Sequence, residues 1–175
     1  PVPPPPTIAA VVNGASFLPG IASAAWVTVM GANLAPTTRL WQASDFVGSL
    51  LPTHLDGVSI NINGKPAYPY YISPTQINVL APDDPALGPV PVEVMTPQGR
   101  SAPAIADKRA VSPGWFLFDA EGSKYIAAVH ADGAYLGKPG LYPGLNFRPA
   151  KPGDIVVLYG TGFGLTEPSH PTAEL

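Results

Sequence analysis

The stretch Val58-Ser59-Ile60-Asn61-Ile62-Asn63-Gly64-Lys65-Pro66-Ala67 decides the fold class. Its three branched apolar residues occupy every second position, which is the pattern of a strand with one buried face. Asn63-Gly64 then supplies the two positive φ angles of a type I′ turn, the connection that joins two strands most tightly. We therefore predict a hairpin in which Val58–Ile62 pairs with Lys65–Ile72.

Short apolar runs of the same kind recur along the chain, separated by many of its 24 prolines and 18 glycines. Strands separated by turns have this appearance, and helical periodicity is confined to one turn within Ala43–Gly48. Pro89 and Pro91 place the start of one run at a sheet edge or a strand end. Further strands are predicted over Ile8–Val12, Trp26–Met30, Gln76–Leu80 and Val90–Met95. The predicted fold class is therefore all-β, built from immunoglobulin-like β-sandwich units.

Period-two spacing within these runs also predicts the core. In the runs Val58–Ile62, Gln76–Leu80 and Val90–Met95, one face carries only branched aliphatic side chains. The residues predicted to be buried are Val58, Ile60, Ile62, Ile77, Val79, Val92 and Val94. Trp26 is added to this core because its neighbours are β-branched.

The chain contains an internal repeat, which predicts two modules. Ile8–Ala15 resembles Ile126–Ala134 with one residue inserted, and Trp26–Leu34 resembles Ile155–Phe163. The polar, turn-rich stretch at 107–115 is where such modules would meet. We predict a proline-rich linker over 1–7, a first sandwich unit over 8–110 and the first part of a second immunoglobulin-like unit over 111–175.

The second unit is expected to be incomplete, because nothing in it matches residues 50–110 of the first. Its strand Ile155–Tyr159 is apolar and uncharged, so it needs a cover. One alternative is that this strand packs on the first unit. The other is that further strands complete its sheet, either from another chain or from a remainder of the same chain. We favour the second alternative, which by repetition would generate an oligomer or a filament.

Composition excludes several classes of function. Charged residues make up only 12% of the 175, the net charge is −3, and the nine basic residues are scattered, which argues against nucleic-acid binding and attraction to membrane surfaces. No apolar run approaches the roughly 20 residues of a membrane-spanning helix, so membrane insertion is not expected. The absence of cysteine removes disulfides and thiol chemistry. The low charge and the wealth of Pro, Thr, Ser and Ala favour a secreted or cell-surface protein, and the first residue, which is not Met, suggests a mature or excised piece.

Five motifs together resemble one known family. They are Val11-Val12-Asn13-Gly14-Ala15-Ser16-Phe17, Leu55-Asp56-Gly57-Val58-Ser59-Ile60, Asn63-Gly64-Lys65-Pro66-Ala67, Ile72-Ser73-Pro74-Thr75-Gln76-Ile77-Asn78-Val79 and Lys151-Pro152-Gly153-Asp154-Ile155-Val156-Val157-Leu158-Tyr159-Gly160-Thr161-Gly162-Phe163-Gly164. In combination they resemble the uncharacterised Solibacter-type C-terminal domain of acidobacterial extracellular proteins, over most of residues 8–172. The glycine-marked strand ends are also similar to IPT/TIG-like modules. The resemblance implies a bacterial extracellular location and this architecture, and no chemistry.

No motif for catalysis or for a cofactor emerges. Gly160-Thr161-Gly162-Phe163-Gly164 follows a strand as a dinucleotide-binding loop would, but Pro168 and Pro171 oppose the helix that such a loop needs, so we interpret it as a tight turn. The three histidines have no metal-ligand spacing, and no G-x-S-x-G elbow is present. Asp83-Asp84 is a calcium candidate, although adjacent acidic residues before a proline are more typical of a turn.

The aromatic residues supply candidate contacts for a ligand or an interface: Tyr68, Tyr70, Tyr71, Trp41 and Trp115. On one strand, Tyr68 and Tyr70 would project to one face and Tyr71 to the other. Exposed aromatic rows stack on sugar rings, but the alternative is core on one face and an intermodule contact on the other. Trp41 and Trp115 fall in connecting segments and are expected to be wedged between the units.

Two functions follow as expectations. The first is a non-catalytic extracellular structural or adhesive module that contacts other protein chains through strand edges or intermodule surfaces, for instance as a subunit of a surface assembly or filament. The alternative is a carbohydrate-binding accessory module of a larger secreted protein, with polysaccharide as its partner. Neither requires a cofactor or a catalytic residue.

Overall fold

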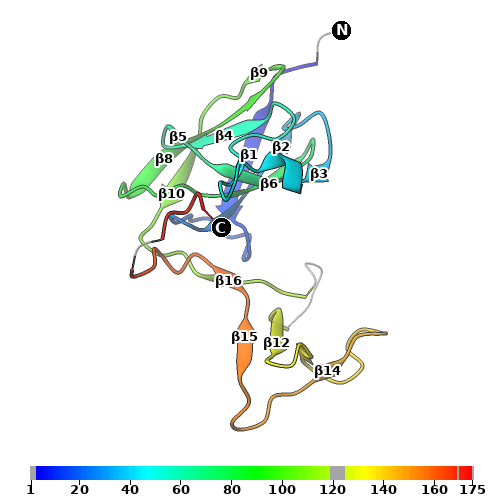
Figure 1. The fold of residues 1–175 in the computed structure, drawn as a ribbon. Helices are drawn as coiled ribbons and strands as arrows, with labels where there is room; N and C mark the ends of the chain where they lie inside the picture. Colours follow the sequence, from blue (N-terminus) through cyan, green and yellow to red (C-terminus); the bar gives the residue numbers. More distant parts are fainter. Residues whose placement is uncertain (1–2, 119–124, 169, 175) are drawn as a thin grey trace.

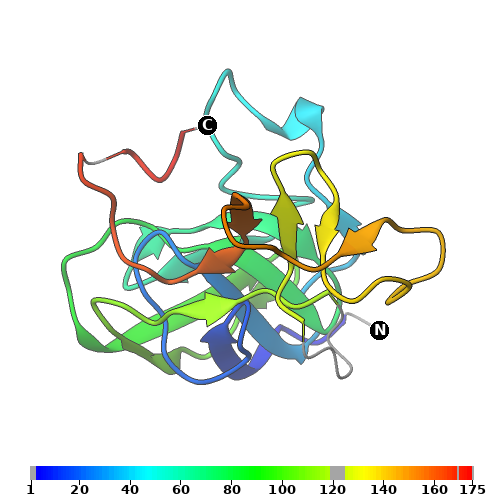
Figure 2. The same cartoon turned by 90° about the horizontal axis from the view of Figure 1, so that it is seen from below.

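The computed structural model describes residues 3–118, 125–168 and 170–174. Two antiparallel sheets built from residues 7–108 face each other across a shared core, and Figures 1 and 2 show them from two sides. Sheet A has the order β1 (Thr7–Asn13), β2 (Trp26–Ala32), β7 (Gln76–Leu80), β6 (Tyr68–Ile72) and β3 (Arg39–Leu40). Sheet B has the order β10 (Ala104–Lys108), β8 (Gly88–Thr96), β4 (Ser59–Ile62) and β5 (Lys65–Pro66), with β9 (Gly99–Arg100) paired to β8. The all-β, immunoglobulin-like sandwich predicted from the sequence is confirmed.

The core lies between the two sheets and follows the period-two pattern. All seven residues predicted from the spacing are completely buried there: Val58, Ile60, Ile62, Ile77, Val79, Val92 and Val94. The single helical turn predicted within Ala43–Gly48 is a 3₁₀ helix at Ala43–Asp45, and the described residues contain no other helix. Accordingly, no helix in the described ranges is long and apolar enough to cross a membrane.

The Asn63-Gly64 turn is confirmed, but the strand after it is shorter than predicted. Asn63 and Gly64 have φ angles of 52° and 74°, as a type I′ turn requires. Only β5 and the Ala67 N–H, which donates to the Ile60 carbonyl, continue the pairing with β4. The chain then crosses to sheet A, so the predicted pairing of Lys65–Ile72 with β4 is wrong beyond Ala67. Pro66 has no N–H for a longer ladder, whereas β6 pairs with a strand on each side in sheet A.

The strand with two prolines extends beyond its neighbour, as predicted. β4 ends at Ile62 opposite Val92, so the segment of β8 that contains Pro89 and Pro91 has a strand neighbour only on the β10 side. A proline there costs no ladder hydrogen bond on the free side.

The strands β11 to β16 form two smaller sheets of their own, seen below the sandwich in Figure 1. β11 (Gly114–Trp115) pairs with β16 (Gly160–Thr161), and a four-stranded sheet has the order β14 (Phe147–Arg148), β13 (Tyr135–Leu136), β12 (Ala128–His130) and β15 (Val156–Leu158). β12 pairs with β15 in the antiparallel sense, as β1 pairs with β2. The two copies of the predicted repeat thus form equivalent strand pairs. Among the described residues, the second pair has no facing sheet like that of the first.

A junction of hydrogen bonds joins this second part to the sandwich. Asn13 is buried, and its Nδ2 donates to the Ser112 carbonyl at 2.6 Å. Its Oδ1 accepts from the N–H groups of Ala15 and Ser16, which fixes the amide. The Trp26 N–H donates to the Thr161 hydroxyl at 2.7 Å.

The apolar strand of the second part is not covered by the first. Ile155 is 74% exposed and Tyr159 is 48% exposed, and Val157 and Leu158 are exposed as well. The alternative in which Ile155–Tyr159 packs on residues 8–105 is therefore wrong. Covering by strands from elsewhere stays a prediction.

Candidate functional site: an aromatic pocket on sheet A

The outer face of sheet A, opposite the core, carries the side chain of Trp26. Val27 and Val29 are fully buried in the core, so the alternation along β2 turns Trp26 and Thr28 to the outer face. The prediction that Trp26 belongs to the core is wrong, because its β-branched neighbours occupy the inward positions. Trp26 is instead half-buried on the outer face.

Trp26 belongs to a cluster of four rings, Trp26, Trp41, Phe46 and Tyr70. The Trp26 ring centroid lies 5.4 Å from Tyr70 and 6.1 Å from Trp41, and Trp41 lies 5.0 Å from Tyr70 and 5.1 Å from Phe46. All four contacts are edge-to-face, a geometry in which each pair adds about 0.5–1.5 kcal/mol beyond its buried area. The backbone N–H of Trp41 also donates to the backbone carbonyl of Tyr70 at 2.8 Å. Two of the five predicted contact residues, Trp41 and Tyr70, are thus brought together.

A β-bulge in β6 changes the faces of its tyrosines. The register shifts between Pro69, opposite Val79, and Tyr71, opposite Asn78. Pro69 and Ile72 are the buried residues of the strand. Tyr68, Tyr70 and Tyr71 therefore all lie off the core, and the prediction that Tyr71 faces away from the other two is wrong. An extra residue in one strand shifts its alternation by one position.

The remaining candidates lie apart from the cluster. Tyr68 lines a separate hollow with Lys65, Asp83 and Thr172, and burial raises the pKa of its hydroxyl. Trp115 lies in β11, is 41% exposed and packs against Phe163 at 5.2 Å. Trp41 lies in a connecting segment as predicted, but it packs within the sandwich. Trp41 and Trp115 each find their ring partners within their own part of the chain, and the position between the units stays a prediction.

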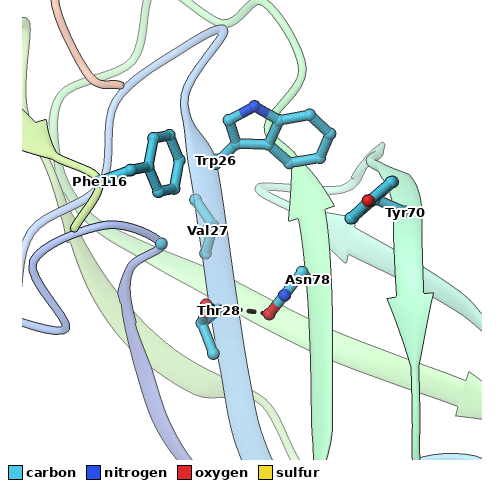
Figure 3. Close-up of a pocket in the computed structure, with 7 residues that line it drawn as sticks. Trp26, Val27, Thr28, Tyr70, Asn78 and Phe116 are labelled. Carbon is cyan, nitrogen blue, oxygen red and sulfur yellow. Dashed lines mark hydrogen bonds between the residues drawn. The ribbon is translucent and has the colours of Figure 1, made fainter. Parts of the chain in front are cut away.

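A pocket of about 380 Å³ opens beside Trp26, within the range of about 300–1,000 Å³ that is typical of small-ligand sites. Its lining comprises Gly14, Trp26, Val27, Thr28, Tyr70, Asn78 and Phe116. In Figure 3, Phe116 stands on one side of Trp26 and Tyr70 on the other. Phe116 comes from the second part of the chain, so the pocket is complete only where both parts meet. No charged side chain lines it.

Asn78 is the polar group with a fixed orientation in this pocket. Its Oδ1 accepts from the Thr28 hydroxyl at 3.0 Å and from Gln76 Nε2 at 2.9 Å. These two donors leave Nδ2 as the free end of the amide. The outward position of Asn78 could be predicted from its alternation with Ile77 and Val79, whereas Phe116 carries no sequence signal that places it here.

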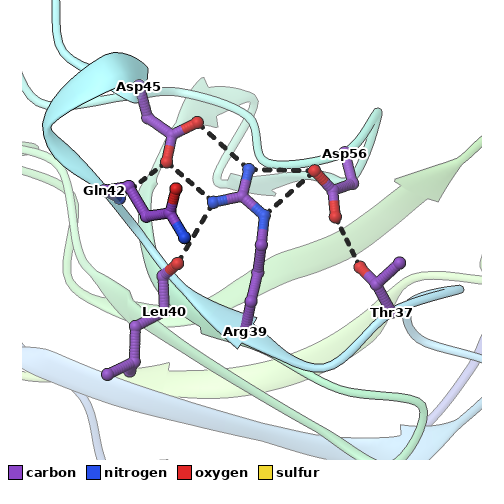
Figure 4. A network of polar contacts seen from close by, with 6 residues as sticks. All are labelled: Thr37, Arg39, Leu40, Gln42, Asp45 and Asp56. Atoms are coloured by element: carbon purple, nitrogen blue, oxygen red, sulfur yellow. Dashed lines mark hydrogen bonds and ion pairs between the residues drawn. The ribbon is translucent and has the colours of Figure 1, made fainter.

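An ion-pair network holds the segment that carries Trp41 and Phe46 (Figure 4). The Arg39 guanidinium contacts both carboxylate oxygens of Asp45, at 2.7 Å and 3.0 Å, and one oxygen of Asp56. Thr37 donates its hydroxyl to Asp56 at 2.6 Å, and the Gln42 N–H donates to Asp45 at 2.7 Å. Hydrogen bonds from Arg39 are the main reason why the pKa values of Asp45 and Asp56 lie below their usual range. Through Arg39, the network ties Asp45 and Asp56 of the loop at 41–58 to β3.

Arg39→Ala is expected to lower the free energy of unfolding at pH 7 by about 1–2 kcal/mol, because charge-assisted, bidentate bonds are lost at a site about a quarter exposed. Arg39→Lys should recover only part of this loss, since an ammonium group cannot form the same fork. Both carboxyl pKa values are lowered in the folded state, so the stabilisation is present above about pH 4 and is lost as the pH falls through the lowered values.

Urea denaturation of the wild type and Arg39→Ala at pH 7 and in acid measures both effects. The matched control is Arg100→Ala, whose pair with Glu93 is more exposed, so its loss should stay below about 0.5 kcal/mol. Equal losses for Arg39→Ala and Arg100→Ala, or a wild-type advantage that persists undiminished in acid, would contradict the prediction.

The other polar candidates form structural contacts. Asp84 accepts from Asn63 Nδ2 at 2.6 Å and pairs with Lys65, and Asp83 accepts from the Thr172 hydroxyl. His130 is buried, with Nε2 3.1 Å from the Arg148 carbonyl. Across the described ranges, no three His, Asp or Glu side chains converge as metal ligands. Gly160–Thr161 is a strand that pairs with β11, so the interpretation of this motif as a tight turn is wrong for its first two residues. Among the described residues after it there is no helix of the kind that a dinucleotide-binding loop needs.

Comparison with known proteins gives similarities at the level of structure alone. No family model matches the chain, and no curated protein matches it. Among solved structures, the chain is similar to a gamma-CGTase from Alkalophilic bacillus clarkii, with 12% sequence identity and a TM-score of 0.43. The match covers 94% of this chain and 22% of that chain, so this chain spans about a fifth of that enzyme's length.

Proposed function

We propose that this chain is a non-catalytic structural or adhesive module that associates with further copies of itself through the free edge of β15. The observation that carries the proposal is an apolar strand edge: Ile155, Val157, Leu158 and Tyr159 are all at least 43% exposed. An exposed, uncharged edge strand is a ready template for pairing with another chain.

The hydrogen-bonding pattern of β15 defines which backbone groups are free. The Ala131 N–H donates to the Ile155 carbonyl, and the Tyr159 N–H donates to the Ala127 carbonyl, with Val157 opposite Val129 between them. N–H and C=O groups alternate in direction along a strand, so those of Val156 and Leu158 point away from β12. Within the described ranges, no strand pairs with that side of β15.

Natural edge strands are usually protected by lysine, proline or a covering segment. The strand Val156–Leu158 contains none of these residues. Addition of a strand from a second copy would pair the free groups and cover the exposed side chains together. Repeated head to tail, the same contact would build a filament.

Val156→Pro tests the proposal because it removes a free edge N–H and leaves the β12 ladder intact. The wild type is expected to associate with rising concentration in analytical ultracentrifugation, and Val156→Pro is expected to remain monomeric. Val156→Thr keeps the N–H and the branched shape, so it should associate like the wild type. A wild type that is monomeric at every concentration, or a Val156→Pro variant that associates equally, would refute assembly through β15.

The proposed setting is the surface or the exterior of a bacterial cell. The low content of charged residues and the resemblance to the Solibacter-type extracellular domain support this location. The second candidate function is that of a carbohydrate-binding accessory module. It is favoured by one observation, the uncharged aromatic pocket beside Trp26, which is separate from the β15 edge.

A further inference from the structure

We propose that the pocket between Trp26, Tyr70 and Phe116 binds one neutral pyranose ring of a saccharide, with Asn78 as its hydrogen-bond donor. The inference rests on the carbohydrate-binding candidate function and is independent of assembly through β15. It assigns this role to three residues, Trp26, Asn78 and Phe116, that sequence patterns did not single out as contacts.

The walls of the pocket suit the apolar face of a sugar. A pyranose presents C–H groups on its ring face and hydroxyl groups around its rim, so it combines an apolar surface with polar edges. Trp26, Tyr70 and Phe116 supply aromatic surface to the pocket from three separate segments. The contacts with Tyr70 and Trp41 hold the indole of Trp26 in place before a ligand arrives. A ring held in this way loses little side-chain entropy on binding.

The amide of Asn78 suits the rim of the same ring. Oδ1 is occupied by Thr28 and Gln76, and Nδ2 donates to no residue in the described ranges. The two N–H bonds of Nδ2 are therefore available to a ligand hydroxyl, in an orientation that the two donors set. The hydroxyl of Tyr70, on the same lining, has no hydrogen-bond partner among the described residues either.

The lining also selects against other ligands. A phosphate, a carboxylate or an ammonium group would find no counter-charge, because no charged residue lines the pocket, and a desolvated unpaired charge is costly. A purely apolar ring would leave the Asn78 amide without an acceptor. A hydroxylated neutral ring satisfies the aromatic walls and the amide together.

The test is titration of the full chain with maltotriose, cellotriose and chitotriose, followed by NMR of the tryptophan indole N–H signals and the Asn78 side-chain amide. At least one saccharide is expected to shift the signals of Trp26 and Asn78, while that of Trp115, outside the pocket, stays in place. Asn78→Ala and Tyr70→Phe should each weaken binding by up to about tenfold, since each loses one hydrogen bond to the ligand.

Tyr71→Phe is the matched control, because it removes a neighbouring hydroxyl on the same strand that does not line the pocket. It should bind like the wild type, and thermal melting of each variant verifies its fold. Three results would overturn the proposal. The first is no shift with any saccharide, and the second is equal weakening by Tyr71→Phe and Tyr70→Phe. The third is a shift with N-acetyl-tyrosinamide but with none of the saccharides. The last result would identify an aromatic peptide side chain as the ligand. Each of these outcomes leaves the ultracentrifugation result for β15 unaffected.

Discussion

Replacing Ile60 with alanine is expected to lower the free energy of unfolding by about 2–5 kcal/mol, the usual cost of truncating a fully buried isoleucine. Ile60 lies in β4 opposite Val94 of β8, and both side chains are completely buried in the core between the two sheets. The neighbouring strands are held in their ladders, so the cavity left by three missing carbons can close only partly.

Ile105→Ala provides the matched control. Ile105 lies in β10 of the same sheet, but its side chain is 66% exposed, so its truncation should change stability by less than about 0.5 kcal/mol. Urea denaturation of the three proteins gives both values. A loss at Ile60 no larger than the loss at Ile105 would show that the outward and inward faces of sheet B have been assigned the wrong way round.

The core could be predicted because it depends on a local regularity. Alternation in Val58–Ile62 and Gln76–Leu80 is set by the geometry of each strand, and burying the branched side chains is the dominant gain on folding. The Asn63-Gly64 turn is equally local, since few residue pairs adopt two consecutive positive φ angles. The core and the turn can therefore be predicted without knowing which strands are neighbours.

Two of the errors lie where non-local pairing decides. The bulge at Pro69–Tyr71 reverses the expected face of Tyr71, in a strand that pairs with both β7 and β3. The crossing after Ala67 is also non-local, because Lys65–Pro66 pair in sheet B whereas Tyr68–Ile72 pair with two strands of sheet A. The outward position of Trp26 is local instead, because it follows from alternation with the buried Val27 and Val29.

The candidate site was only partly predictable for the same reason. Tyr70 and Trp41 could be selected because aromatic side chains are common in ligand and interface contacts. The approach of Phe116 to Trp26 depends instead on how the second part of the chain is fixed at the junction. That geometry comes from hydrogen bonds such as those of Asn13 with Ser112 and of Trp26 with Thr161, between residues that are about 100 positions or more apart.

Gly162→Ala is expected to disrupt this junction, lowering the free energy of unfolding by about 3–5 kcal/mol. Gly162 has a φ of +80°, and a Cβ atom added there would lie 1.8 Å from the Ser112 carbonyl oxygen. The Ser112 N–H donates to the Gly162 carbonyl at 2.8 Å, and the same Ser112 carbonyl accepts from Asn13. The methyl group must therefore displace Ser112, and both hydrogen bonds would break with it.

Gly153→Ala separates this clash from backbone strain. Gly153 has a similar φ of +90°, but no atom lies within 4 Å of the added Cβ, so its loss should be limited to the roughly 1–2 kcal/mol of a left-handed alanine. The Trp26 amide donates to Thr161 across the junction, and the Ser112 amide donates to Gly162 beside it. Hydrogen exchange at both amides should accelerate in Gly162→Ala and stay unchanged in Gly153→Ala. If the two glycine variants lost equal stability, the close approach of Gly162 to Ser112 would not be what holds the second part of the chain against the sandwich.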